Sequence, residues 1–125
     1  MNGFSERLEK LARLIDDDKG LDFLGLVHRT DAPDRWDLVV SSPALEPGGV
    51  DALRYVAGRL PKALKKSEII SLARIVALPR ENELLSRLSQ DERVRPGVVS
   101  PLIDSRFDRA LLIRPLTKAD AASAK

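Results

Sequence analysis

The spacing of apolar residues changes near residue 20, and this change limits the possible folds more than any other feature of the chain. Before it, apolar residues recur at steps of four, three and four, which places them along one side of a helix. They are Phe4, Leu8, Leu11 and Ile15. After it come two apolar runs of strand length, residues 21–30 and 36–42, joined by a segment whose proline and aspartates favour a turn. The pattern predicts an N-terminal helix followed by an antiparallel β-hairpin.

Helices and strands continue to alternate in the second half of the chain. We expect helices at 50–60 and 82–89, a short buried strand at 73–78 and a last strand at 110–116. Pro61 cannot lie inside a regular helix without cost, so it either kinks the first of these helices or opens a second one.

This order of elements predicts one α/β domain of the α+β kind over residues 1–117, with a mixed sheet, an N-terminal hairpin and flanking helices. The sheet has four strands, or five if residues 90–108 add an edge strand instead of forming only a loop. A helix between the second and third strands is long enough for a parallel crossover. Residues 118–125 are mostly small or charged, and we expect a disordered C-terminal tail there.

Composition excludes several kinds of site. The 125 residues include no cysteine and one histidine, which rules out disulfides, thiolate zinc sites and a cysteine nucleophile. We therefore expect no metal site and no cofactor. The chain has no apolar run of about 20 residues and no secretory signal at its start, so it should not span a membrane and should be cytoplasmic.

Charge gives little sign of a nucleic-acid partner. The 21 basic and 19 acidic residues leave a net charge of +2, which steers partners only weakly. A local basic excess spans residues 54–66, but the chain has only one Trp, one Tyr and three Phe for stacking on bases. We therefore do not expect the chain to bind nucleic acid.

The segment 41–51 is the strongest candidate for a ligand site. It follows a predicted strand and leads into a helix, and the free N–H groups at a helix start attract anions. Ser41, Ser42, Gly48 and Gly49 would provide hydroxyl groups and a close backbone approach for a phosphate. The same residues also suit an ordinary turn, and two acidic residues of the segment oppose an anion. The turn is the simpler interpretation, and the anion site stays open beside it.

Residues 25–40 contain a second candidate, Asp37, which is followed by an apolar run. This segment loosely resembles the signature of the small nucleotidyltransferases, in which a Gly-Ser turn precedes a pair of aspartates that bind Mg²⁺ and a triphosphate. Leu26 and Arg35 stand where that signature has its serine and its first aspartate. The resemblance therefore implies at most a degenerate relative, in which Asp34 and Asp37 would contact a metal ion or a ribose.

Two large apolar residues are candidates for a subunit interface. Trp36 begins the second predicted strand, where an isolated indole favours a half-buried contact. Leu85 lies in the short helix at 82–89 and could fall outside its core face. His28 has no partner at a spacing that would indicate a catalytic arrangement, so we expect it to be structural.

Because no complete catalytic constellation is present, the sequence favours a small cytoplasmic protein-interaction or regulatory module that lacks catalytic activity and associates with itself. The alternative is a nucleotide- or phosphate-binding domain that uses residues 41–51 and Asp37. The first hypothesis predicts a homo-oligomer or an unidentified protein partner, and the second predicts stabilisation of the chain by a ligand.

Overall fold

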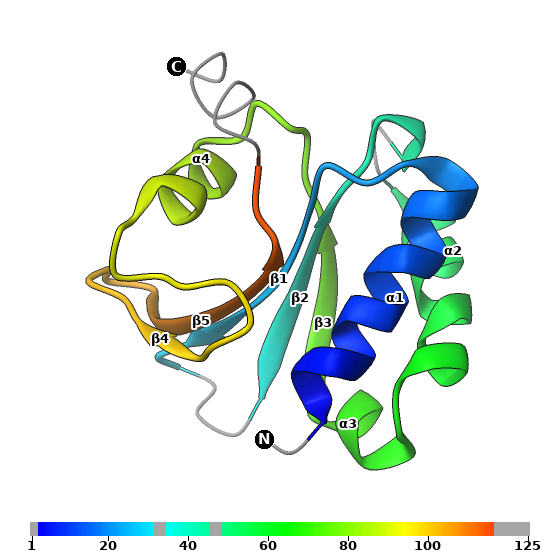
Figure 1. The fold of residues 1–125 in the computed structure, drawn as a ribbon, viewed down its shortest axis with the longest axis horizontal. Helices are drawn as coiled ribbons and strands as arrows, with labels where there is room; N and C mark the ends of the chain where they lie inside the picture. Colours follow the sequence, from blue (N-terminus) through cyan, green and yellow to red (C-terminus); the bar gives the residue numbers. More distant parts are fainter. Residues whose placement is uncertain (1–2, 32–34, 46–48, 117–125) are drawn as a thin grey trace.

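A mixed five-stranded sheet runs through the molecule, with helices on both of its faces (Figure 1). The computed structural model describes residues 3–31, 35–45 and 49–116. Within these residues, the helices are α1 (Phe4–Lys19), α2 (Val50–Ala63), α3 (Lys66–Ile70) and α4 (Glu83–Gln90), with a 3₁₀ turn at Pro43–Leu45. The strands are β1 (Phe23–Arg29), β2 (Trp36–Ser41), β3 (Leu72–Ala77), β4 (Ser100–Pro101) and β5 (Phe107–Arg114).

The strand order β3-β2-β1-β5-β4 puts β1 at the centre of the sheet. The hairpin β1–β2 is antiparallel, β2 and β3 are parallel, and β5 is antiparallel to both β1 and β4. The predicted α+β fold, with a mixed sheet and an N-terminal hairpin, is confirmed. The fifth strand is β4, which lies in the stretch where the sequence left a strand or a loop open.

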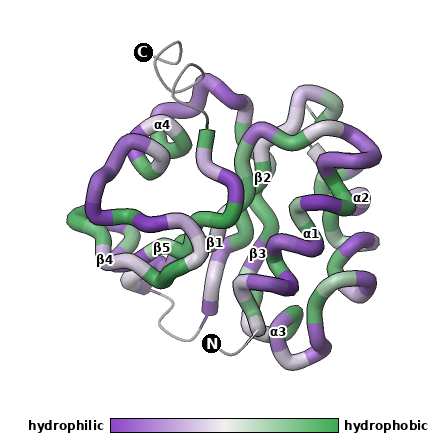
Figure 2. The backbone as a smooth tube through the Cα atoms, in the orientation of Figure 1, coloured by the Kyte–Doolittle hydropathy of each residue, from purple (hydrophilic) through white to green (hydrophobic). Residues whose placement is uncertain are grey.

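Each face of the sheet carries its own core. The helices α1, α2 and α3 cover one face and α4 covers the other (Figure 1). Side chains alternate between the two faces along β1, so Leu24 and Leu26 join the first core and Phe23 and Val27 the second. In Figure 2, hydrophilic and hydrophobic stretches follow one another along α1, because only one side of this helix faces the sheet.

Gly25 lets β5 approach the central strand closely. A Cβ atom at this position would lie 3.0 Å from Leu112 Cδ2 and 3.2 Å from the backbone oxygen of Leu111. The pairing of β1 with β5 also shifts register between Leu24 and Gly25. A side chain at this point would push the two strands apart.

The structure decides between the two alternatives for Pro61, which does not open a second helix, and it overturns the prediction for one strand. Pro61 lies inside α2, near its end, and a separate helix, α3, begins at Lys66. All six residues of β3 keep some exposure, because within the described ranges β3 pairs with a strand on one side only, with β2. The prediction that residues 73–78 form a buried strand is therefore wrong, and β3 is an edge strand.

The predicted tail at 118–125 lies outside the described residues, so its disorder stays a prediction. Across the described ranges, no helix is both long enough and apolar enough to cross a membrane.

Candidate functional site

Two adjoining cavities lie between α4, the sheet and the segment that joins β4 to β5. The larger has a volume of about 650 Å³ and the smaller about 360 Å³. Leu84, Arg87 and Phe107 line both of them. Cavities of this size accommodate small organic ligands.

The smaller cavity combines an apolar floor with an arginine rim. Its floor is built by strands from across the sheet and includes Val27, Val39, Val76 and Phe107. Arg74, Arg87 and Arg106 reach the cavity from β3, from α4 and from the loop before β5. Their side chains are 55%, 49% and 62% exposed, so solvent reaches all three guanidinium groups.

Asp37 holds one of these arginines in place from below. Its side chain is 2% exposed, and its Oδ2 accepts a hydrogen bond of 3.0 Å from Arg74 Nε and lies 3.2 Å from Arg29 Nε. The parallel pairing of β2 with β3 sets Asp37 directly beside Arg74. Asp37 Oδ1 is buried and has no hydrogen-bond partner among the described residues. These two guanidinium groups therefore offset the free-energy cost of burying the carboxylate charge.

Asp104 links the other two arginines. Its Oδ2 lies 2.6 Å from Arg87 Nη2, and its Oδ1 accepts a 2.7 Å hydrogen bond from the backbone N–H of Arg106. These bonds, first that from the Arg106 backbone and then that from Arg87, lower the pKa of Asp104 below its usual range. The Arg106 guanidinium lies over the Phe107 ring at 5.2 Å. The loop before β5 is thus tied to α4 by charge.

Most donors of the three arginines stay unused. A guanidinium group has five N–H donors. Within the described parts of the chain, Arg74 and Arg87 each give one side-chain nitrogen to a carboxylate, and Arg106 Nε approaches Asp104 only at 3.7 Å. The remaining donors are available to an anion in the cavity.

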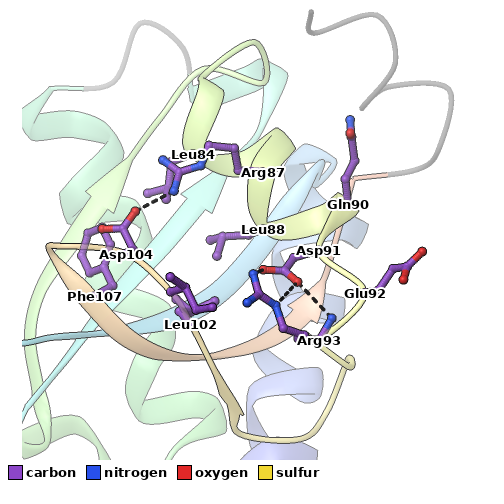
Figure 3. Close-up of a pocket in the computed structure, with 11 residues that line it drawn as sticks. Leu84, Arg87, Leu88, Gln90, Asp91, Glu92, Arg93, Leu102, Asp104 and Phe107 are labelled. Carbon is purple, nitrogen blue, oxygen red and sulfur yellow. Dashed lines mark hydrogen bonds and ion pairs between the residues drawn. The ribbon is translucent and has the colours of Figure 1, made fainter.

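The larger cavity has a different character (Figure 3). Its apolar lining consists of Leu84, Leu88, Leu102, Ile103 and Phe107. Four of its charged residues form two ion pairs: Arg93 Nε lies 3.0 Å from Asp91 Oδ1, and Figure 3 shows Arg87 directed to Asp104. The Arg93 side chain and then its backbone N–H lower the pKa of Asp91 by hydrogen bonding. The larger cavity therefore offers apolar surface, whereas the smaller one offers free donors.

The described residues offer no metal centre, since they contain no group of three or more His, Asp or Glu side chains that could hold an ion. Asp37, which the sequence proposed as a metal or ribose contact, is occupied by Arg29 and Arg74. Asp34 lies outside the described residues. The resemblance to nucleotidyltransferases therefore finds no support in the geometry around Asp37.

The described residues of the predicted anion site at 41–51 do not come together with Asp37. Ser42 is buried, and its Oγ donates a 2.7 Å hydrogen bond to the backbone oxygen of Gly20. Ser41 is also buried, and it lies about 13 Å along β2 from Asp37. Gly49 precedes α2 with a φ of 85°.

Gly48 lies outside the described residues, so its part in this segment stays a prediction. The Ser42 hydroxyl, in contrast, is already used inside the protein and ties β2 to the end of α1.

Of the two proposed interface residues, Trp36 keeps some exposure and Leu85 has none. Leu85 packs in the second core together with Leu88, because these two of the three leucines in this eight-residue helix are buried against the sheet. The proposal of Leu85 as a surface contact is therefore wrong for this chain. Trp36 meets the His28 ring edge-on at 5.3 Å and has the Arg109 guanidinium over it at 5.6 Å.

His28 is a structural residue with both ring nitrogens engaged. Its side chain is 3% exposed; Nδ1 lies 2.8 Å from Asp108 Oδ1, and Nε2 lies 3.1 Å from Arg109 Nη2. A register shift after His28 brings these two consecutive residues of β5 to the same ring. Since arginine only donates, Nε2 accepts and Nδ1–H donates to Asp108. The ring therefore has no free nitrogen to act as a base.

Sequence reasoning missed the arginine rim. Arg74, Arg87 and Arg106 are far apart in the chain, and no spacing rule links them. To predict the Asp37–Arg74 pair, we would have needed the register of the parallel strands β2 and β3, which no local sequence pattern gives. Comparisons of the chain with protein-family models, with curated proteins and with solved structures found no match.

Proposed function

We propose that the chain is a binding module without catalytic activity whose ligand is a small organic anion. The ligand class is an oxyanion, a phosphate monoester or a carboxylate, carried on a compact apolar body. The observation that supports this most directly is the convergence of Arg74, Arg87 and Arg106 on one cavity with an apolar floor. This proposal keeps the phosphate-binding hypothesis from the sequence but moves the site from residues 41–51 to the opposite side of the sheet.

Charge and shape agree with such a ligand. Several guanidinium donors can bind one oxyanion in a planar, bidentate manner. The valines and Phe107 below them would bury an apolar body, and ligand sites commonly combine apolar walls with a few fixed polar groups. Asp37 and Glu83 also line the cavity and lower its net positive charge to about +1. Asp37 in turn keeps Arg74 in one orientation, which reduces the entropy lost on binding.

The hydrogen bonds and ion pairs of His28, Asp37 and Asp104 support binding rather than catalysis. General acid–base chemistry needs a group that can exchange a proton with a substrate. Both nitrogens of His28 are hydrogen-bonded, and Asp37 and Asp104 each face two arginines. These groups position arginines rather than wait for a substrate proton.

The test is a titration of the ¹⁵N-labelled protein with four probes: phenyl phosphate, benzoate, inorganic phosphate and benzyl alcohol. We expect phenyl phosphate or benzoate to shift amide signals of α4, β3 and the loop before β5, and to bind more tightly than benzyl alcohol. Comparing phenyl phosphate with benzoate identifies the oxyanion, and comparing it with inorganic phosphate measures the role of the apolar floor.

Arg106→Met is the critical variant, because Arg106 is exposed and lines only the smaller cavity. Loss of its charge-assisted hydrogen bonds should weaken phenyl phosphate binding about tenfold. Arg93→Met is the matched control, since Arg93 lines only the larger cavity and has a similar exposure of 52%. Equal weakening by both variants, equal binding of benzyl alcohol, or no binding of any probe at about 10 mM would overturn the proposal.

A further inference from the structure

The edge of the sheet at β3 is a second surface built for contact. The interior strands β1 and β2 are buried along almost their whole length, whereas every residue of β3 retains some exposure. An open strand edge presents unpaired N–H and C=O groups and is a template for another strand. At the other end of the sheet, β4 has two residues, which is too short to serve the same purpose.

The backbone of β3 shows which groups point outward. The N–H of Leu78 donates a 2.9 Å hydrogen bond to the backbone oxygen of Val40, so Leu78 points toward β2. Backbone direction alternates along a strand, so Arg74 and Val76 also face β2, and Ile75 and Ala77 direct their N–H and C=O groups to the open edge. A register shift before Arg74 confines this regular stretch to residues 74–78.

Apolar side chains reach this edge from both cores. Ile75 and Ala77 pack against the core under α1 and α2, and Val76 and Leu78 pack against the core under α4. All four remain partly exposed. A strand added at this edge would therefore bury apolar surface on both faces of the sheet at once.

We propose that β3 pairs in antiparallel fashion with β3 of a second copy of this chain, about a two-fold axis at Val76. In this register Ile75 faces Ala77 of the second copy, and each such pair exchanges two backbone hydrogen bonds. Val76 faces Val76 across the axis, and Arg74 faces Leu78. The pairing joins two sheets into one and extends both cores across the interface.

In this register β3 is complementary to itself, without opposed like charges or a break in the ladder. This self-complementarity favours a second copy of the chain as the partner. An axis at Arg74 would set two guanidinium groups directly opposite each other, which is destabilising. An axis at Ile75 would place Ala77 opposite Ala73, where the irregularity before Arg74 breaks the ladder. The axis at Val76 needs no hydrogen bond from Pro79, which has no N–H, and leaves no like charges in contact.

The first measurement is the mass in solution by sedimentation, without any ligand, over a range of protein concentrations. We expect a reversible dimer of twice 13.8 kDa. Ala77→Pro removes an N–H that faces the open edge and should abolish the dimer, since an edge strand tolerates proline where its N–H faces outward. A chain that stays monomeric at about 1 mM, or a dimer that survives Ala77→Pro, overturns the proposal.

Cross-linking tests the register itself, because the chain has no cysteine of its own. Val76 pairs with itself at a position without backbone hydrogen bonds, where the Cα atoms lie about 4.5 Å apart, within reach of a disulfide. We expect Val76→Cys to form a covalent dimer under mild oxidation. Ile75→Cys should form much less of it, because Ile75 faces Ala77 of the second copy and not another Ile75. Val98→Cys, at a valine that is 56% exposed and distant from β3 in the chain, is the matched control. Equal cross-linking of all three variants overturns the register.

Discussion

Arg7 and Glu68 join α1 to α3 through a two-pronged ion pair. Arg7 Nη2 lies 2.6 Å from Glu68 Oε2, and Arg7 Nε lies 2.8 Å from Glu68 Oε1. Glu68 Oε1 also accepts a 2.8 Å hydrogen bond from the backbone N–H of Lys65 at the start of α3. One carboxylate thus caps a five-residue helix and fixes it against the N-terminal helix.

Replacing this carboxylate should cost stability. We expect Glu68→Gln to lower the melting temperature by roughly 5 °C, because the amide weakens both the bond to Arg7 and the cap of α3. Glu92→Gln changes an exposed carboxylate in the same way and serves as the control. Circular dichroism during heating measures both, and equal melting temperatures for the two variants would contradict the structural role of Glu68.

The same pair predicts a pH dependence of stability. The Arg7 side chain, helped by the Lys65 backbone, lowers the pKa of Glu68 in the folded state. A carboxyl whose pKa is lowered by folding stabilises the protein above its unfolded pKa, and this stabilisation is lost as the pH falls through the folded value. The difference between wild type and Glu68→Gln should therefore be present at pH 7 and shrink in the acid range below about pH 4.5. A difference that stays constant down to the acid limit would show that it does not come from ionisation.

Leu85 should behave as a core residue and not as an interface residue. We expect Leu85→Ala to reduce the free energy of unfolding by about 3 kcal/mol, since it leaves a cavity in a fully buried site. Ile103→Ala removes a similar side chain that is 79% exposed and should change stability by less than about 0.5 kcal/mol. Urea unfolding separates the two, and similar losses for both would show that Leu85 is not enclosed.

Asp37 should be needed for stability because it is the counter-charge of two arginines. Asp37→Asn should lower the free energy of unfolding by about 2 kcal/mol, less than for a fully buried ion pair, because Arg74 is half exposed. A double-mutant cycle with Arg74→Met isolates the pair, and we expect the second substitution to cost little once the first is made. Strict additivity in urea unfolding would contradict this pairing.

His28 should hold its proton on Nδ1. Long-range ¹H–¹⁵N spectra at pH 8 identify the tautomer directly, and the donor–acceptor order through Asp108 and Arg109 requires the Nδ1–H form. Arg109→Met alone should leave the Nδ1–H form dominant, because the Asp108 carboxylate still accepts from Nδ1–H. A wild-type ring protonated mainly on Nε2 would contradict the arrangement.

Local patterns were sufficient for most of the fold. The helical stripe of α1 and the two apolar runs of the hairpin are short-range signals, and the structure has α1, β1 and β2 where these signals lie. The position of β3 at an edge was not predictable, because a short apolar run has the same appearance in the centre and at the edge of a sheet. Leu85 was misassigned because three leucines in an eight-residue helix leave the direction of the core face open.

The candidate cavity depends on contacts that no local pattern contains. Asp37 was selected from the sequence, but its partner Arg74 is set by the pairing of β2 with β3. Arg106 joins the same cavity through a loop whose position depends on Asp104 and α4. Such sites arise from tertiary structure, so the residue types alone gave no reason to group them.

The division of the apolar interior between the two sides of the sheet has a dynamic consequence. The layer under α4 rests on a single short helix and a loop held by the Arg87–Asp104 pair, whereas α1 and α2 together cover the other side. A subglobal opening can therefore detach α4 from the sheet while the helices on the opposite face keep the sheet intact. Amide hydrogens of α4 should then exchange with solvent well before those of β1. The arginines are open to solvent in the folded state, so such an opening would mainly widen the access to the apolar floor beneath them.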